Sequence, residues 1–161
     1  MFIQRFTPGQ ALQKAKHYCA YQERSHYETA VKLYNFGLYK MEVEQILSQL
    51  IEEGYLNEER YAIHFAGGKF RVNKWGKIKI QYHLKQKKVS SYSIKKALHE
   101  IDEQVYAETL QKLAADKWDG LKKEQYINRL AKTTHYLLQK GFEPELISQS
   151  LTAIRKNGKE Q

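Results

Sequence analysis

The sequence predicts an all-α fold made of tandem three-helix units. Helix-start signals recur along the 161 residues, and one pattern of apolar residues occurs three times with identical spacing. Only two prolines are present, so few segments are barred from helix. The repeats lie about 45 to 53 residues apart, a period typical of stacked units that form an elongated array.

The first unit is expected over residues 7–56, with helices at about 8–22, 26–36 and 40–53. Thr7 and Gln10 form a capping-box pattern around Pro8, which takes the first helical position, where its missing N–H costs nothing. Ser25 and Glu28 form a second capping box at the start of the next helix.

The second unit is expected over residues 57–101, with helices at about 57–71, 76–87 and 91–100. Asn57 supplies a cap and is followed by two glutamates in the first turn, where the helix dipole favours anions. Residues 77–84 alternate polar and apolar side chains, which taken locally fits a strand about as well as a helix. Helix is preferred because Leu84 takes the repeat position that Leu33 and Leu137 hold on helical patterns.

The third unit is expected over residues 102–156, with helices at about 103–117, 123–140 and 144–156, followed by a disordered tail at 157–161. Asp102 caps its first helix. Ile101 precedes this cap and Tyr106 follows it, which is the spacing of a hydrophobic staple. Leu56 and Tyr61 flank the cap of the second unit in the same way.

The repeated apolar pattern has spacings of 5, 5, 4 and 3 residues. Its three copies are Leu33, Leu38, Val43, Leu47 and Leu50; Leu84, Val89, Ile94, Leu98 and Ile101; and Leu137, Phe142, Ile147, Leu151 and Ile154. Four residues after each leading leucine stand Gly37, Lys88 and Gly141, where we expect a helix to end in the left-handed conformation. At Lys88 that conformation costs roughly 1 kcal/mol, because the residue has a Cβ.

Positive charge is concentrated in the second unit. Residues 60–99 contain eleven lysines and arginines and no carboxylate, against a net charge of +9 for the whole chain. Six large aromatic residues lie among these cations. Such a surface is suited to bind a phosphate backbone or an acidic protein groove. The alternative is that this face is only solvated and keeps the protein soluble.

Several classes of function are disfavoured. No segment approaches the roughly 20 apolar residues of a membrane span, and the single Cys19 fits a reducing compartment, so we expect a soluble cytoplasmic protein. Gly67-Gly68-Lys69 lacks the first glycine and the Ser/Thr of a phosphate-binding loop, and the six histidines lack metal-ligand spacing. We expect neither enzymatic activity nor a cofactor nor a bound metal.

One motif in the second unit is specific. It runs Leu56-Asn-Glu-Glu-Arg-Tyr-Ala-Ile-His-Phe65, Lys69-Phe-Arg71, Trp75-Gly76, Ile80, Leu84, Lys87 and Ile94-Lys-Lys-Ala-Leu98. This series resembles the core motif of the RecX family of regulatory proteins. The resemblance extends over about residues 7–156, although the third unit matches only as generic helix. Lys88 departs from the family pattern, which usually has glycine there.

The resemblance implies an elongated, curved array that binds the filament of RecA recombinase on single-stranded DNA. It implies inhibition of filament growth, ATP hydrolysis and strand exchange, and thereby modulation of recombination, DNA repair and the SOS response. A monomer is expected, in contact with DNA directly or through the filament and with no membrane partner. The alternative reading is a stand-alone protein that binds nucleic acid without sequence preference.

The candidate interface consists of the cations around the corner at residues 69–79 and those further along the same helix. These cations are Lys69, Arg71, Lys74, Lys77, Lys79, Lys85, Lys87 and Lys88, and Trp75 is included because it lies among them. Trp75 is expected either to pack between helices or to stack on a base or partner side chain. Arg60 is left out, because it can serve local electrostatics beside the glutamates of its own helix turn. The structural residues of the motif are Tyr61, Ala62, Phe65, Gly76, Ile80, Leu84 and Leu98.

Overall fold

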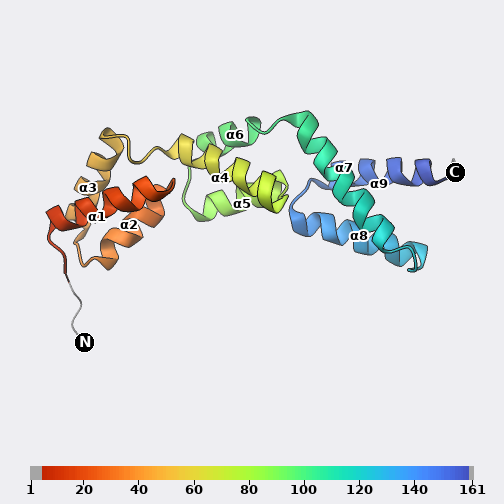
Figure 1. Ribbon diagram of the computed structural model, residues 1–161, viewed down its shortest axis with the longest axis horizontal. Coiled ribbons are helices and arrows are strands. Elements are labelled where there is room, and N and C mark those ends of the chain that lie inside the picture. Colours follow the sequence, from red (N-terminus) through yellow and green to blue (C-terminus); the bar gives the residue numbers. More distant parts are fainter. Residues whose placement is uncertain (1–4, 160–161) are drawn as a thin grey trace. The chain divides into compact units, whose positions relative to one another are not determined.

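The computed structural model describes residues 5–159, and these residues form nine α-helices and no strand (Figure 1). The helices are α1 (Pro8–Tyr21), α2 (His26–Asn35), α3 (Lys40–Glu52), α4 (Glu58–Asn73), α5 (Lys77–Gln86), α6 (Ser91–His99), α7 (Glu103–Gly120), α8 (Tyr126–Lys140) and α9 (Pro144–Lys159). The all-α prediction is confirmed. Residues 77–84, where the local pattern alternates, lie in α5 as the repeat predicted.

The chain divides into two compact units. The first unit consists of the described residues up to Phe65 together with His83–Ala97. The second consists of Ala66–Tyr82 and the described residues from Leu98 onward. All three boundaries between the units fall inside helices, within α4, α5 and α6. The two units therefore do not follow the three expected repeats, and the repeat boundaries at 56/57 and 101/102 remain a prediction.

In the first unit, α1, α2 and α3 surround one apolar core (Figure 1). The buried residues of α1 are small, which lets the helix lie close to its neighbours. The core consists of Ala11, Ala15, Cys19, Leu33, Leu38, Val43, Ile46, Leu50 and Leu56. The two expected capping boxes are present, and the Ser25 hydroxyl accepts the Glu28 amide proton at an N–O distance of 3.0 Å.

In the second unit, α7 packs against both α8 and α9 (Figure 1). It buries Tyr106, Leu110, Ala114 and Trp118, which are four residues apart and therefore lie along one face of the helix. Residues of the third copy of the repeat complete this core, namely Leu137, Phe142, Ile147 and Leu151. The Asp102 carboxylate accepts the Val105 amide at 2.9 Å, as expected of a cap.

Left-handed residues follow the apolar repeat. Gly37, Lys88 and Gly141 have φ angles of 87°, 59° and 94°, so the expected conformation is confirmed in all three copies. Two further left-handed residues, Gly54 and Lys74, were not expected. At the end of the chain, α9 continues through Lys159, so residues 157–159 are helical where a disordered tail was expected. Residues 160–161 lie outside the described residues.

Candidate basic interface

The candidate interface residues are distributed over both compact units. Lys69, Arg71, Lys74, Trp75, Lys77 and Lys79 belong to the second unit, whereas Lys85, Lys87 and Lys88 belong to the first. The structure therefore places the group around the α4–α5 corner, residues 69–79, within one unit, but does not place it relative to the group at the end of α5. Each group has its own geometry.

The indole of Trp75 lies at the centre of the corner group. The Nζ atoms of Lys69 and Lys79 lie 5.1 Å and 4.6 Å from its ring centroid, within the range of a cation–π contact. All three residues are half-buried. The indole ring thus lies beside one ammonium group from α4 and another from α5. This combination suits binding of a nucleic-acid base or of an acidic side chain.

Several cations of this corner also satisfy the ends of helices. Lys74 donates to the carbonyl of Arg71 at 2.9 Å, near the end of α4, and Lys140 donates to the carbonyl of Asn73 at 3.1 Å. Lys79 donates to the carbonyl of Gln139 at 3.3 Å, near the end of α8. A helix C-terminus carries partial negative charge, so these ammonium groups stabilise the two helix ends. Part of the positive charge thus has a structural use.

The corner is attached to the turn between α8 and α9 through backbone groups. The amide of Gly76 donates to the carbonyl of Lys140 at 2.7 Å, and the amide of Ile78 donates to the carbonyl of Gly141 at 3.0 Å. The first amides of α5 thereby find partners outside their own helix. The start of α5 is consequently held in place by another segment of the chain.

Tyr106 of α7 provides a second attachment. Its ring lies 5.6 Å from that of Phe70 and 5.2 Å from that of Phe142, measured between centroids. Its hydroxyl accepts the amide proton of Lys77 at 3.0 Å and donates to the carboxylate of Glu143. Burial, together with this bond to Glu143, raises the pKa of the Tyr106 hydroxyl above its ordinary value, so it stays protonated and able to donate.

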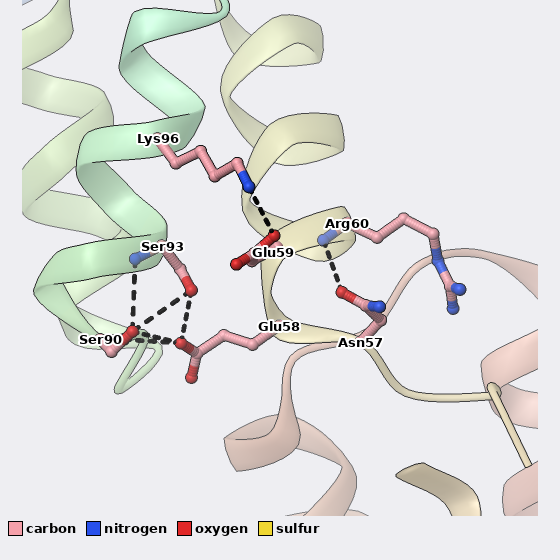
Figure 2. A network of polar contacts seen from close by, with 7 residues as sticks. All are labelled: Asn57, Glu58, Glu59, Arg60, Ser90, Ser93 and Lys96. Atoms are coloured by element: carbon pink, nitrogen blue, oxygen red, sulfur yellow. Dashed lines mark hydrogen bonds and ion pairs between the residues drawn. The ribbon is translucent and has the colours of Figure 1, made fainter. Parts of the chain in front are cut away.

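Arg60 and Lys96 of the carboxylate-free segment pair with carboxylates outside it. Arg60 lies 2.5 Å from Glu23 and also donates to the carbonyl of Gly54 at 3.0 Å, so it connects α4 with the segments before it. Lys96 of α6 pairs with Glu59 of α4 at 3.1 Å (Figure 2). The expected partners of Arg60 were the glutamates of its own helix turn, but its ion pair is with Glu23, 37 residues earlier in the chain.

Glu58 joins the starts of α4 and α6 (Figure 2). One carboxylate oxygen accepts hydrogen bonds from the Ser90 hydroxyl, from the Ser90 amide at 3.3 Å and from the Ser93 hydroxyl at 2.7 Å. Burial alone would raise the pKa of this carboxyl, but the serine hydrogen bonds outweigh burial and the pKa lies below its ordinary value.

The group at the end of α5 is more exposed. Lys85 and Lys88 are exposed, and Lys88 holds the left-handed turn that ends the helix. Lys87 lies 3.6 Å from Glu28 of α2, so part of its charge is balanced within the first unit. This group therefore offers two accessible cations and one that is paired.

The structural residues of the motif lie in the core or at its edge. Tyr61, Ala62, Gly76, Ile80 and Leu84 are buried, and Phe65 and Leu98 are half-buried. Lys140 was not among the predicted interface residues, although it lies beside the corner. Its hydrogen bond goes to Asn73, 67 residues earlier in the chain, so no local sequence signal identifies it.

Within residues 5–159, no cluster of His, Cys, Asp or Glu is arranged to hold a metal ion. The helices of that range include none that is long and apolar enough to span a membrane. What the geometry does provide is ammonium and guanidinium groups beside exposed or half-buried aromatic rings.

Comparison with known proteins identifies the family of this chain. Residues 57–98 match the model of the second three-helix domain of RecX, and residues 104–151 match that of the third. A regulatory protein RecX from Prosthecochloris aestuarii is 31% identical over 147 residues, covering 91% of this chain and 95% of that protein. One from Lactobacillus johnsonii is 32% identical over 136 residues, covering 84% of this chain and 50% of that protein, so the chain spans about half the length of that relative.

Solved structures agree on the fold. The crystal structure of RecX from Lactobacillus salivarius superposes with a TM-score of 0.83 at 22% identity, covering 92% of this chain and 96% of that chain. A second crystal structure, of a regulatory protein RecX, gives a TM-score of 0.79 at 25% identity, covering 88% of this chain and 71% of that chain. The chain belongs to the RecX family of regulatory proteins.

Proposed function

We propose that this protein binds the filament that RecA recombinase forms on single-stranded DNA and inhibits its growth, its ATP hydrolysis and its strand exchange. The observation that supports this most directly is the carboxylate-free segment 60–99 in a chain of the RecX family, in which Lys69 and Lys79 lie against the ring of Trp75. In this proposal the protein acts in the cytoplasm as a monomer, without catalytic activity, cofactor or metal.

The mechanism that we propose is steric and electrostatic. The chain contacts several recombinase subunits along the filament groove, and its cations also approach DNA phosphates. Contacts to neighbouring subunits restrain the conformational cycling that hydrolysis and strand exchange require, because a ligand that binds one state more tightly shifts the equilibrium toward it. The fixed corner supports this role, since a preorganised surface loses less entropy on binding.

Variants of the two basic groups test where the filament is contacted. Lys69, Arg71 and Lys77 are changed together to Gln for the corner group, leaving the helix-end contacts of Lys74 and Lys79 intact. Lys85 and Lys88 are changed to Gln for the other group. The matched control changes Lys112, Lys122 and Lys123, which are exposed cations outside the carboxylate-free segment.

Strand exchange by cognate RecA is then followed with each variant at equal concentration. We expect at least one basic-group variant to require several-fold more protein for half-inhibition, while the control inhibits like the wild type. Circular dichroism shows that each variant is folded. If both basic-group variants inhibit normally, the assignment of the interface to residues 69–88 is wrong.

A second candidate function is sequence-independent binding of single-stranded nucleic acid without recombinase. The contacts of Lys69 and Lys79 with Trp75 favour it, because alternating cations and rings suit phosphates and bases. If about six phosphates are neutralised, the logarithm of affinity falls with the logarithm of salt concentration at a slope near −4. Tight binding to bare DNA with no effect on recombinase would favour this function.

A further inference from the structure

A second surface of cations and aromatic rings lies in the first unit, outside the carboxylate-free segment. Its members are joined in series by ring and cation–π contacts, and we call it the aromatic–cationic ribbon. It consists of Lys14, Phe6, Phe36, Lys32, Tyr18, Arg24 and Tyr21.

One end of the ribbon is built on Phe6 and Phe36. The Nζ atom of Lys14 lies 4.7 Å from the ring centroid of Phe6, and the two phenylalanine rings meet edge to face at 5.2 Å. Lys32 lies 5.7 Å from the Phe36 ring. Both rings are half-buried and both lysines are exposed, so the charges are accessible above an apolar base.

The other end is built on two tyrosines of α1. Lys32 lies 5.3 Å and the guanidinium of Arg24 3.8 Å from the ring of Tyr18. Arg24 also approaches the ring of Tyr21 at 5.9 Å, and that ring is 83% exposed. Lys14, Tyr18 and Tyr21 are spaced four and three residues apart, so they lie along one face of α1.

The neighbouring carboxylates are engaged elsewhere. Glu23 is bound to Arg60 at 2.5 Å. Glu28 accepts the amide of Ser25 at 2.7 Å and pairs with Lys87 at 3.6 Å. The three cations of the ribbon therefore keep a net positive charge available to a ligand.

We propose that the aromatic–cationic ribbon binds single-stranded nucleic acid, with bases stacking on its rings and phosphates contacting Lys14, Arg24 and Lys32. Unpaired bases offer flat faces that stack on aromatic side chains without sequence preference, and the phosphates between them match cations placed between rings. A duplex hides those faces, and an acidic peptide would use the cations but not the rings. The ribbon would thus let the first unit bind a strand independently of the second.

The test measures binding of a fluorescein-labelled oligothymidylate by fluorescence anisotropy over a series of salt concentrations. The first variant carries Lys14→Gln and Lys32→Gln. Arg24 is retained, because it donates to the carbonyl of Tyr18 at 3.0 Å and its loss could disturb the end of α1. Removing two phosphate contacts should reduce the magnitude of the salt slope by about 1.4. The matched control, Lys122→Gln with Lys123→Gln, removes equal charge in the other unit and should leave the slope much closer to that of the wild type.

A second variant, Tyr21→Ala, removes one exposed ring without removing charge. Its affinity for the oligonucleotide should fall about fivefold or more with an unchanged salt slope, as expected for the loss of one stacked base. Tyr126→Ala, which removes a tyrosine that is 55% exposed in the second unit, is the control. With 5-iodouracil in the oligonucleotide, ultraviolet crosslinks should map to the tryptic peptide 17–24, which contains Tyr18 and Tyr21.

The proposal is overturned if the wild type does not bind the oligonucleotide at low salt, or if both variants bind with the affinity and salt slope of the wild type. It is also overturned if the variants lose inhibition of recombinase while oligonucleotide binding is unchanged, since the ribbon would then contact protein. The binding assay contains no recombinase. A negative result for oligonucleotide binding therefore does not contradict the proposed recombinase role. A negative result for recombinase inhibition does not contradict nucleic-acid binding by the ribbon.

Discussion

Gly76 packs directly against the backbone of Gly141. A Cβ built on Gly76 would lie 2.3 Å from the Gly141 carbonyl oxygen, and one built on Gly141 would lie 2.2 Å from the Cβ of Lys79. Two segments 65 residues apart therefore meet where neither can carry a side chain. This contact fixes the start of α5, and with it the corner that holds Trp75.

Gly76→Ala should accordingly destabilise the protein by about 3 kcal/mol, because backbone atoms rather than a flexible side chain must move to admit the methyl group. Urea unfolding followed by circular dichroism measures the loss. Gly68→Ala in α4 is the control, since nothing lies within 4 Å of the added Cβ. It should raise stability by roughly 0.5–1 kcal/mol through helix propensity. Equal stability of both variants would show that the close contact is absent.

Lys88→Gly should stabilise the protein by about 1 kcal/mol, because glycine adopts the left-handed conformation at φ 59° without steric cost. Lys85→Gly, within α5, removes the same charge but should destabilise by about 1 kcal/mol. The two thermal unfolding midpoints should shift in opposite directions. A decrease for both variants would mean that Lys88 is not strained.

Tyr106→Phe should cost about 1–3 kcal/mol in the free energy of unfolding. The substitution keeps the ring against Phe70 and Phe142 but leaves the amide of Lys77 and the carboxylate of Glu143 without the hydroxyl. Chemical denaturation of the single variants Tyr106→Phe and Glu143→Gln and of the double variant measures the coupling. Strictly additive effects would argue that the hydrogen bond contributes nothing.

Glu58→Gln should reduce stability near neutral pH by about 1–2 kcal/mol, since the hydrogen bonds from Ser90 and Ser93 then reach a neutral acceptor. The folded-state pKa of Glu58 lies below its ordinary value of 4.5, so its contribution is present above pH 4.5 and is lost as the pH falls through that lower pKa. The difference in thermal midpoint between wild type and variant should therefore shrink in acid. A difference that stays constant down to pH 3 would contradict this, and Glu44→Gln, at an exposed position, serves as the control.

Helix boundaries were predictable because the signals that set them are local. The capping boxes at Thr7 and Ser25 form as the sequence indicates, and the left-handed residue at position 88 follows from the repeat even though it is a lysine. At residues 77–84 the local pattern alone was ambiguous, and only the position of Leu84 in the repeat decided for helix. Comparison of the three copies of the repeat therefore supplied the helix assignment that the local pattern of residues 77–84 did not.

The contacts of the cations were not predictable, because they join segments distant in the chain. Lys79 meets Gln139 and Lys140 meets Asn73 across 60 and 67 residues, so composition could identify the basic segment but not which charges stabilise helix ends. The aromatic–cationic ribbon was missed for a related reason. The spacing of Lys14, Tyr18 and Tyr21 on one face is visible in the sequence, but Arg24 and Lys32 join it only after α1 and α2 pack together.

ATP hydrolysis by cognate RecA on single-stranded DNA is the first measurement for the proposed filament regulation, with this protein added in increasing amounts below those that would saturate the DNA. We expect hydrolysis to fall at amounts well below one molecule per recombinase subunit, because in the proposed mechanism each bound molecule restrains several neighbouring subunits. Unchanged hydrolysis, with RecA shown to be active in the same reaction, would contradict the proposed role as a filament regulator.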